Sequence, residues 1–292
     1  MKPAKPSRSS FHRIRGLHYH VRRWGPPEGP PLFLLHGWMD VSASFQFLVD
    51  ALEGPWQCIA PDWRGFGLSG WDEGDYRFAD YLGDLDALLD LYADGVPAPL
   101  LGHSMGGNIA CLYAGVRPER VSHVVSLEGF GLPASCPEEA PGRYRRWLDE
   151  LKTPAAFSEY ASLEAVAARL RKNNPRLTEE QARFLAPHWA RPEPDGRVRL
   201  VSDPKHKRVN PVLYRLEEAI ACWRRIEAPV LWVLGEESTL AHQYRNAPEE
   251  FERRRAAIAR LRVETLADAG HMMHHDQPRA LARRVEAFLM ES

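Results

Sequence analysis

The chain has 292 residues, of which 44% are hydrophobic and 26% are charged, and its formal net charge is −1. This composition is typical of a globular protein with a sizeable core and argues against a disordered chain. The near-zero charge gives no general attraction to nucleic acid or to an anionic membrane, and the apolar runs are shorter than the roughly 20 residues that span a bilayer. We therefore expect no nucleic-acid or membrane partner.

Neither the cysteines nor the N-terminus indicates secretion. Cys58, Cys111, Cys136 and Cys222 form no C-x-x-C pair, so we expect free thiols in a reducing, cytoplasmic compartment. Residues 1–10, MKPAKPSRSS, are basic and rich in Pro and Ser, and no apolar run follows them. They predict a flexible tail rather than a signal peptide.

Strand patterns begin with two short edge strands over residues 11–25, which turn at Gly16. Continuous apolar runs follow, of the kind found in parallel strands that are covered on both faces. They are PLFLLHG (31–37), QCIAPD (57–62), APLLGHS (98–104), SHVVSLEG (122–129), PVLWVLGE (229–236) and the weaker RVETLADAGH (262–271).

Helical patterns alternate with these runs over residues 78–93, 106–116 and 278–290. The alternation predicts an α/β fold with an open, mostly parallel, twisted sheet flanked by helices. Residues 132–224 interrupt it with helix-like segments and no parallel-type strand. Thr178 and Gln181 have the spacing of a capping box at one helix start. We expect a helical cap over 132–224 and a core made of residues 11–131 and 225–292.

Residues 102–106, Gly-His-Ser-Met-Gly, match the pattern G-x-S-x-G. An apolar strand precedes the match and a helix rich in small residues follows it, which is the setting of a nucleophile elbow. The sharp turn would hold Ser104 in a strained conformation with its hydroxyl in a cleft. The helix that starts there would bring amides, including that of Met105, to stabilise an oxyanion.

Four motifs in order, HGWMD (36–40), DWRGFGLSG (62–70), GHSMGG (102–107) and AGHMMHHDQP (269–278), resemble those of the α/β-hydrolase fold family. The segments LEGFGLP (127–133) and NPRLTEEQARFLAPHW (174–189) are most similar to its branch of serine hydrolase-like proteins. The resemblance implies that the amides of Trp38 and Met105 form the oxyanion hole.

The resemblance also implies that His271 is the general base, with His274 and His275 as the competing histidines. It implies no cofactor. A metal bound by His271, His274, His275 and Asp276 is an alternative, but no partner cluster of ligands accompanies them, so we expect no metal.

The acid of the expected Ser–acid–His triad is ambiguous. Most of the family carries it three residues after Gly235, where this chain has Ser238, and Glu236 and Glu237 lie just before. Other members, including haloalkane dehalogenases, carry it at the end of an earlier strand, where this chain has Glu128. We favour Glu128, with Glu237 or Glu236 as alternatives. A structural reading of Glu128 pairs it with Arg143 or Arg145 at the start of the cap.

The substrate pocket is predicted from residues near the motifs and in the cap. We expect His36, His103, Trp147 and Trp189 to line it. The basic segment DPKHKRVNP (203–211) suits either an anionic substrate or a solvated loop.

A serine at position 104 suits acyl transfer. We expect a serine hydrolase that cleaves a small carboxylic ester or related acyl compound, as a monomer or small homo-oligomer. The alternatives are a catalytically weak ligand-binding protein, and an acyltransferase or C–C hydrolase with the same triad.

Overall fold

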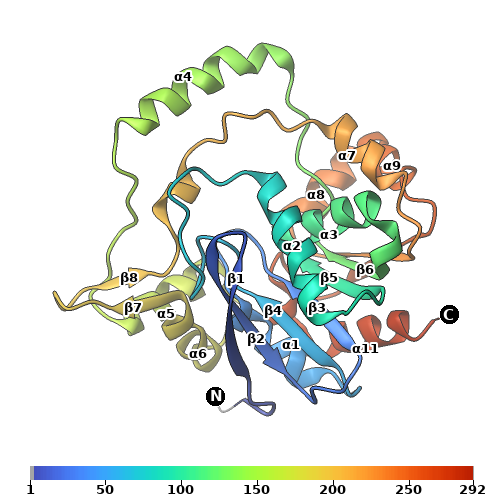
Figure 1. The fold of residues 1–292 in the computed structure, drawn as a ribbon, viewed down its shortest axis with the longest axis horizontal. Coiled ribbons are helices and arrows are strands. Elements are labelled where there is room, and N and C mark those ends of the chain that lie inside the picture. Colours follow the sequence, from blue (N-terminus) through green and yellow to red (C-terminus); the bar gives the residue numbers. More distant parts are fainter. Residues whose placement is uncertain (1–2, 292) are drawn as a thin grey trace.

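The structure is a computed structural model that describes residues 3–291. Within these residues the main sheet has eight strands in the order β1-β2-β4-β3-β5-β6-β9-β10 (Figure 1). The strands are β1 (Arg8–Ile14), β2 (Leu17–Trp24), β3 (Pro31–Leu35), β4 (Gln57–Pro61), β5 (Ala98–His103), β6 (Val121–Leu127), β9 (Val230–Gly235) and β10 (Leu261–Leu266). β1 pairs with β2, and β2 with β4, in antiparallel fashion, whereas the other pairs are parallel. The predicted α/β class and mostly parallel sheet are confirmed.

Helices cover both faces of this sheet. The helices are α1 (Gln46–Ala51), α2 (Phe78–Tyr92), α3 (Met105–Val116), α4 (Ala140–Leu151), α5 (Leu163–Asn173), α6 (Glu179–Trp189), α7 (Leu216–Trp223), α8 (Thr239–Asn246), α9 (Pro248–Arg255), α10 (Met273–Asp276) and α11 (Pro278–Leu289). One apolar core lies between the sheet and α2, α3 and α7, and the other between the sheet and α1 and α11. The strands are apolar on both faces because both faces are covered.

The N-terminal segment is more ordered than the sequence predicts. β1 begins at Arg8, and the main-chain amides of Ala4 and Lys5 donate hydrogen bonds to the carboxylate of Asp50 at 3.2 and 2.8 Å. The expectation of a flexible tail over residues 1–10 is therefore wrong for residues 4–10. Residues 1 and 2 lie outside the described part of the chain.

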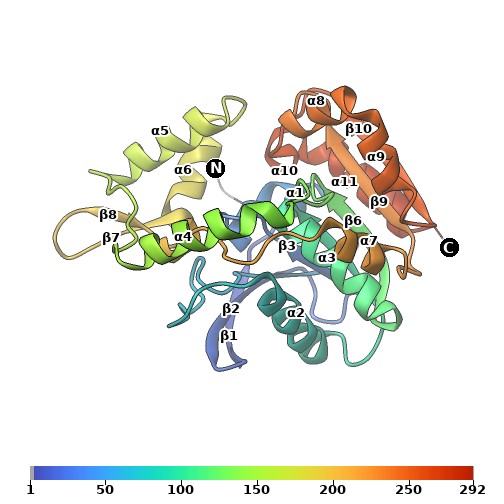
Figure 2. The same cartoon turned by 90° about the horizontal axis from the view of Figure 1, so that it is seen from above.

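The inserted segment forms a small layer beside the sheet. α5 and α6 pack on each other and on the short hairpin of β7 (Ala190–Pro192) and β8 (Val198–Leu200), and they share a core with Phe47 of α1. The Thr178–Gln181 capping box is present at the start of α6. α4 buries no residue and stands apart from the sheet (Figures 1 and 2).

The last helix of the predicted cap belongs to the core instead. α7 packs on α3, and its Trp223 is buried against the sheet residue Trp232 in the larger core cluster. The inserted layer therefore ends before Leu216 rather than at residue 224, because the apolar face of α7 completes the cover of α3.

All four cysteines are unpaired. Within residues 3–291 no helix combines the length and apolar character needed to cross a membrane.

Candidate active site

Ser104 occupies a sharp turn between β5 and α3. Its backbone has φ 52° and ψ −113°, a left-handed conformation that is strained for a residue with a Cβ atom. The turn is tight because α3 starts directly at Met105. A Cβ atom on Gly102 or on Gly106 would collide with backbone atoms of Gly106 or Leu35. Only glycine therefore fits on either side of the serine, as the G-x-S-x-G pattern requires.

Backbone hydrogen bonds hold the strained turn. The Ser104 amide donates to the Leu127 carbonyl of β6 at 2.7 Å, and the Ser104 carbonyl accepts from the Asn108 amide at 3.0 Å. The Asn108 side chain then accepts from the Gly131 amide at 2.6 Å. These bonds tie the serine turn to the segment that follows β6, which carries Glu128.

His271 lies in the loop between β10 and α10. Its carbonyl oxygen accepts a 2.8 Å hydrogen bond from Nε2 of His103, and the Gly270 amide donates to Asp276 at 2.9 Å. Its side chain is 50% exposed, and its Nδ1 lies 3.4 Å from Oε2 of Glu128. Within residues 3–291 the Ser104 hydroxyl makes no hydrogen bond, so the imidazole and the hydroxyl are not yet engaged.

Glu128 immediately follows β6 and also has a positive φ, of 59°. Its side chain is fully buried. Oε1 accepts hydrogen bonds of 2.8 Å from the Gly235 amide and from the Ser238 hydroxyl, which leaves Oε2 for His271. Sequence reasoning missed that Ser238 holds this carboxylate; the signal was a hydroxyl at the position where most of the family has its acid.

The structural reading of Glu128 as an ion-pair partner of cap arginines is wrong. Arg143 lies 3.7 Å from Glu139 and donates to the Asn210 carbonyl. The buried carboxylate instead has three neighbouring donors from the sheet edge and the loops around it, which is what a buried charge requires.

The other two candidate acids are exposed or have another partner. Glu237 forms an ion pair with Arg176, and half of its side chain is exposed. Glu236 is exposed, and its main chain bonds to Leu266 and to the Arg245 side chain. In the described part of the chain, neither carboxylate is hydrogen-bonded to a histidine.

The competing histidines are buried. His274 and His275 lie 3.2 and 2.6 Å from the Ser44 hydroxyl through their Nε2 atoms. Burial, followed by the neighbouring histidines, holds the pKa of His274 well below its usual range. Burial also lowers the pKa of His275 to about 3. Both rings are therefore neutral parts of the core, whereas His271 is accessible.

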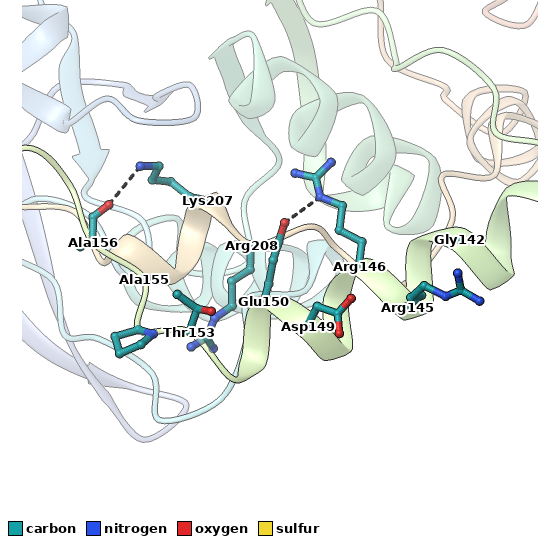
Figure 3. Close-up of a pocket in the computed structure, with 11 residues that line it drawn as sticks. Gly142, Arg145, Arg146, Asp149, Glu150, Thr153, Ala155, Ala156, Lys207 and Arg208 are labelled. Atoms are coloured by element: carbon teal, nitrogen blue, oxygen red, sulfur yellow. Dashed lines mark hydrogen bonds and ion pairs between the residues drawn. The ribbon is translucent and has the colours of Figure 1, made fainter.

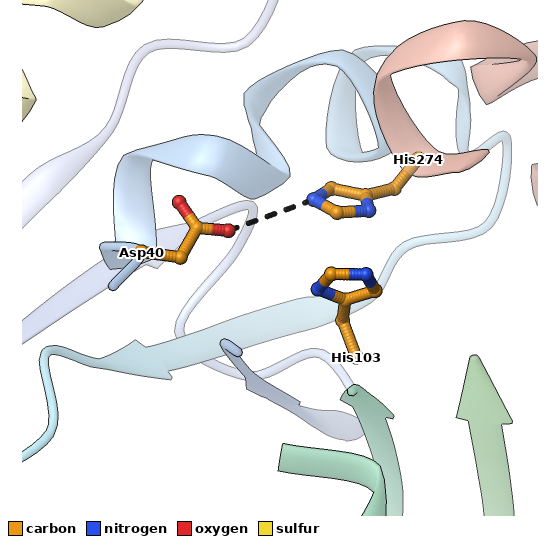
Figure 4. Close-up of side chains that lie close together, drawn as sticks. All are labelled: Asp40, His103 and His274. Carbon is orange, nitrogen blue, oxygen red and sulfur yellow. Dashed lines mark ion pairs between the residues drawn. The ribbon is translucent and has the colours of Figure 1, made fainter. Parts of the chain in front are cut away.

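Asp40, His103 and His274 could together hold a metal ion, since one ligand atom of each lies within 4.8 Å of the others and all three side chains are buried (Figure 4). Burial raises the pKa of Asp40 to about 7. However, Asp40 Oδ2 and His274 Nε2 are 3.9 Å apart, whereas bonds of about 2.1 Å around tetrahedral zinc need ligand atoms about 3.4 Å apart. At this pair of atoms the cluster is therefore wider than a tetrahedral zinc site.

The amides of Trp38 and Met105 are free donors. Trp38 follows β3 in a turn, and Met105 is the first residue of α3. Among the described residues, neither amide donates a hydrogen bond. An uncommitted pair of amides next to a nucleophile suits the binding of an oxyanion.

Two of the four residues expected to line the pocket have other partners. His36 is fully buried; its Nδ1 donates to the Gly37 carbonyl at 2.8 Å, its Nε2 accepts from the Trp63 amide at 2.9 Å, and burial lowers its pKa to about 4. Trp147 donates to Asp75 at 2.9 Å and so ties α4 to the core. Neither lines a cavity described below.

His103 is buried as well, and burial and the nearby His271 hold its pKa well below its usual range. Trp189 alone of the four lines a cavity, of about 350 Å³, which also contacts Trp38. Trp38 also lines a second cavity, of about 170 Å³, and Met105 is part of the wall of this cavity. Of the two oxyanion candidates, Trp38 therefore lines both cavities and Met105 lines the smaller one.

The chain matches the family model described as the alpha/beta hydrolase fold over residues 30–278. It is 28% identical to a serine hydrolase-like protein of Danio rerio over 221 residues, which cover 73% of this chain and 67% of that protein. It is 29% identical to the 2-(acetamidomethylene)succinate hydrolase of Mesorhizobium japonicum over 223 residues, 76% and 75% of the two chains.

Among solved structures, the thioesterase domain from the curacin biosynthetic pathway has a TM-score of 0.85 and 26% identity, and the match covers 97% of this chain and 99% of that one. The family match spans most of the chain, and the structural match covers nearly all of it. The chain therefore belongs to the alpha/beta hydrolase fold family.

Proposed function

We propose that the protein is a serine hydrolase that cleaves a small carboxylic ester or a related acyl compound. The observation that carries the proposal is the buried carboxylate of Glu128, whose Oε2 lies 3.4 Å from His271 Nδ1 while Oε1 accepts two hydrogen bonds. A fully buried carboxylate beside a half-exposed imidazole suits the stabilisation of an imidazolium. Together with a strained serine, it supports an activated nucleophile.

In the proposed reaction, Ser104 Oγ attacks the acyl carbon while His271 Nε2 takes the hydroxyl proton. Glu128 accepts from Nδ1–H and stabilises the positive charge on the ring. The amides of Trp38 and Met105 donate to the developing oxyanion, a pair worth roughly 3 kcal/mol or more for each donor. His271 then gives its proton to the leaving alkoxide, which departs as an alcohol.

The acyl-enzyme is hydrolysed by the same groups. His271 takes a proton from water, the resulting hydroxide attacks the acyl carbon, and the proton returns to Ser104 Oγ as the carboxylic acid leaves. The side chain of His271 is 50% exposed, which gives it access to solvent. No cofactor takes part in either half of the reaction.

The relatives support a hydrolase more strongly than a particular substrate. One similar protein is named a 2-(acetamidomethylene)succinate hydrolase, and a similar structure is a thioesterase domain. Both names describe hydrolytic enzymes, which supports a hydrolase. An acyltransferase or C–C hydrolase would use the same triad with another acceptor or leaving group.

One observation favours a second candidate, a ligand-binding protein with weak catalysis. The Ser104 hydroxyl makes no hydrogen bond within residues 3–291. In apo enzymes, however, such bonds are often long and tighten only when substrate binds. We therefore retain this candidate only as an outcome of the following test.

A fluorophosphonate probe tests the proposal directly, because it reacts with activated serines. We expect labelling at Ser104, with loss in Ser104→Ala and slow labelling in His271→Gln. Ser126→Ala is the matched control, since that hydroxyl is buried and donates to the Gly129 carbonyl. A folded wild-type protein that is not labelled would overturn the hydrolase and favour the binding protein. A panel of p-nitrophenyl esters then defines the acyl length.

A further inference from the structure

Three cavities share lining residues, and two of them include an oxyanion candidate. Trp38 lines both the cavity of about 170 Å³ beside Met105 and the cavity of about 350 Å³ beneath the inserted layer. The third cavity is an open cleft of about 680 Å³ along α4 (Figure 3). Lys207 lines this cleft and the larger of the other two cavities, and Arg208 lines this cleft and the smaller one. The basic segment 203–211 is therefore the wall that the three cavities have in common.

This segment is anchored to the core at its start. The 3₁₀-helix η4 (Pro204–Lys207) carries His206, whose ring stacks between Phe66 and Tyr76 at centroid distances of 3.9 and 3.7 Å. The Tyr76 hydroxyl donates to Asp203 at 2.7 Å. Asp203 and His206 therefore anchor the segment to the core, whereas the side chains of Lys207 and Asn210 are exposed.

Some of these cations are already neutralised. Arg208 lies 3.1 Å from Asp75, and Lys205 lies 3.3 Å from Asp203 and donates to main-chain carbonyls. These two therefore hold the segment to the core and are not available to a ligand.

Two cations of the 350 Å³ cavity have no acidic partner. Lys207 donates only to the Ala156 carbonyl, at 3.0 Å, and lies 5.1 Å from the centre of the Phe157 ring. Arg169 of α5 forms no hydrogen bond or ion pair with any residue from 3 to 291. Glu159, which stands in the sequence between the cavity-lining residues Ser158 and Tyr160, forms ion pairs with Arg197 and Arg199 instead.

The rest of this cavity is mostly apolar. Among the described residues that line it there is no Asp or Glu, and the wall is built from aromatic and aliphatic side chains, namely Phe157, Tyr160, Val166, Leu170, Trp189 and Leu200. A cavity with an apolar wall and two unneutralised cations suits a ligand with a hydrocarbon body and an anionic end.

We propose that the acyl substrate carries a terminal carboxylate, which Arg169 and Lys207 bind in this cavity. The substrate class is then a monoester or monothioester of a dicarboxylic acid, with its carbon chain along the apolar wall and its reacting carbonyl at Trp38 and Met105. This inference rests on the proposed hydrolase. It adds selection for charge at the far end of the acyl chain, which the Ser–His–Glu arrangement does not provide.

A matched pair of esters tests the inference. Mono-p-nitrophenyl adipate and p-nitrophenyl hexanoate have the same six-carbon acyl chain and the same leaving group, and only the first has a terminal carboxylate. We expect the adipate ester to have the higher kcat/KM, and the preference to weaken as salt is raised. Equal kcat/KM values for the two esters at low salt would overturn the proposal.

Variants of Arg169 and Lys207 test whether these two side chains cause the preference for the adipate ester. Arg169→Gln and Lys207→Gln should each lower kcat/KM for the adipate ester by about ten-fold or more, since each removes a charge-assisted hydrogen bond, and should lower it far less for the hexanoate ester, which has no terminal charge. Arg171→Gln is the matched control, because it removes the same charge from α5 at a residue that lines none of the three cavities. An equal loss with Arg171→Gln would show a general field and contradict the site.

A binding measurement covers the case of slow turnover. Monomethyl adipate should slow fluorophosphonate labelling of Ser104 at a concentration at least about ten-fold lower than methyl hexanoate does, and Arg169→Gln should remove the difference. Equal protection by the two compounds would overturn the anion site alone. Absence of labelling without either compound would instead overturn the proposed hydrolase, so the two failures are distinguishable.

Discussion

The hydroxyl of Ser238 donates a 2.8 Å hydrogen bond to Oε1 of Glu128. Ser238 stands at the loop position where most of the resembled family has its acid, and Glu128 stands at the end of β6, so the two positions converge on one buried point beside His271. The Ser238 oxygen also accepts from the Ala241 amide at 2.9 Å and starts α8. The chain thus has a polar side chain at both position 128 and position 238, but a carboxylate only at position 128.

Glu128→Gln tests whether this carboxylate is the acid. We expect kcat on a p-nitrophenyl ester to fall by about 1,000-fold or more, because the amide cannot stabilise the imidazolium. Glu237→Gln is the matched control, since that side chain is half exposed and paired with Arg176, and its kcat should stay within about three-fold of wild type. Circular dichroism checks the folds. A Glu128→Gln variant with nearly full activity would assign the acid elsewhere.

Moving the acid tests the convergence of the two positions. Ser238→Asp alone puts a second carboxylate against Glu128, and we expect it to lower the free energy of unfolding by roughly 1–3 kcal/mol. In Glu128→Gln/Ser238→Asp the repulsion is gone and the new carboxylate lies on the same side of His271. We expect kcat at least about ten-fold above that of Glu128→Gln. No gain in a folded double variant would show that Asp at position 238 cannot reach the imidazole.

The parallel strands were predictable because burial on both faces leaves a continuous apolar run in each. PVLWVLGE is β9, for example, and all six of its residues from Val230 to Gly235 are buried. The limits of the inserted layer were not predictable in this way. α7 has an amphipathic pattern like that of a cap helix, and only the three-dimensional packing against α3 shows that it belongs to the core.

The site shows the same division. Ser104 and His271 stand in motifs whose local geometry the chain itself dictates, and Glu128 was suggested by the missing carboxylate at position 238. Pocket residues depend instead on where side chains point after folding. His36 is a neighbour of Trp38 in sequence, yet its ring is turned into the core and both nitrogens bond to the main chain. No local sequence pattern shows whether such a side chain points into the core or into the pocket.

Trp38→Ala separates the side chain of Trp38 from its amide. The indole is 53% exposed and lines both cavities, so its loss should raise KM for p-nitrophenyl hexanoate by about five- to ten-fold through lost apolar contact. kcat should change by less than about three-fold, because the backbone donor remains. Trp71→Ala is the control, since Trp71 is 49% exposed and lines neither cavity. A large fall in kcat with unchanged KM would contradict this division of roles.

Buried neutral histidines should make the fold sensitive to acid. Burial lowers the pKa of His275 from 6.5 to about 3 and that of His36 from 6.5 to about 4. Above pH 6.5 each ring is neutral in both states and adds no pH dependence. Below that pH the unfolded chain binds protons that the folded chain does not. The free energy of unfolding should therefore fall by about 1.4 kcal/mol per pH unit for each ring, until the folded pKa is reached.

Urea unfolding at pH 7, 6 and 5 measures this effect. We expect His275→Gln to be less stable than wild type at pH 7, because the ring packs against Phe47 and its Nε2 lies 2.6 Å from the Ser44 hydroxyl. The difference should shrink by about 2 kcal/mol at pH 5, since the variant lacks the group that the unfolded chain would protonate. His18→Gln, at an exposed position of β2, is the control for the loss of a histidine at the surface. A variant at position 275 with an unchanged slope would show that this ring binds protons equally in the folded and unfolded protein, and would contradict the lowered pKa.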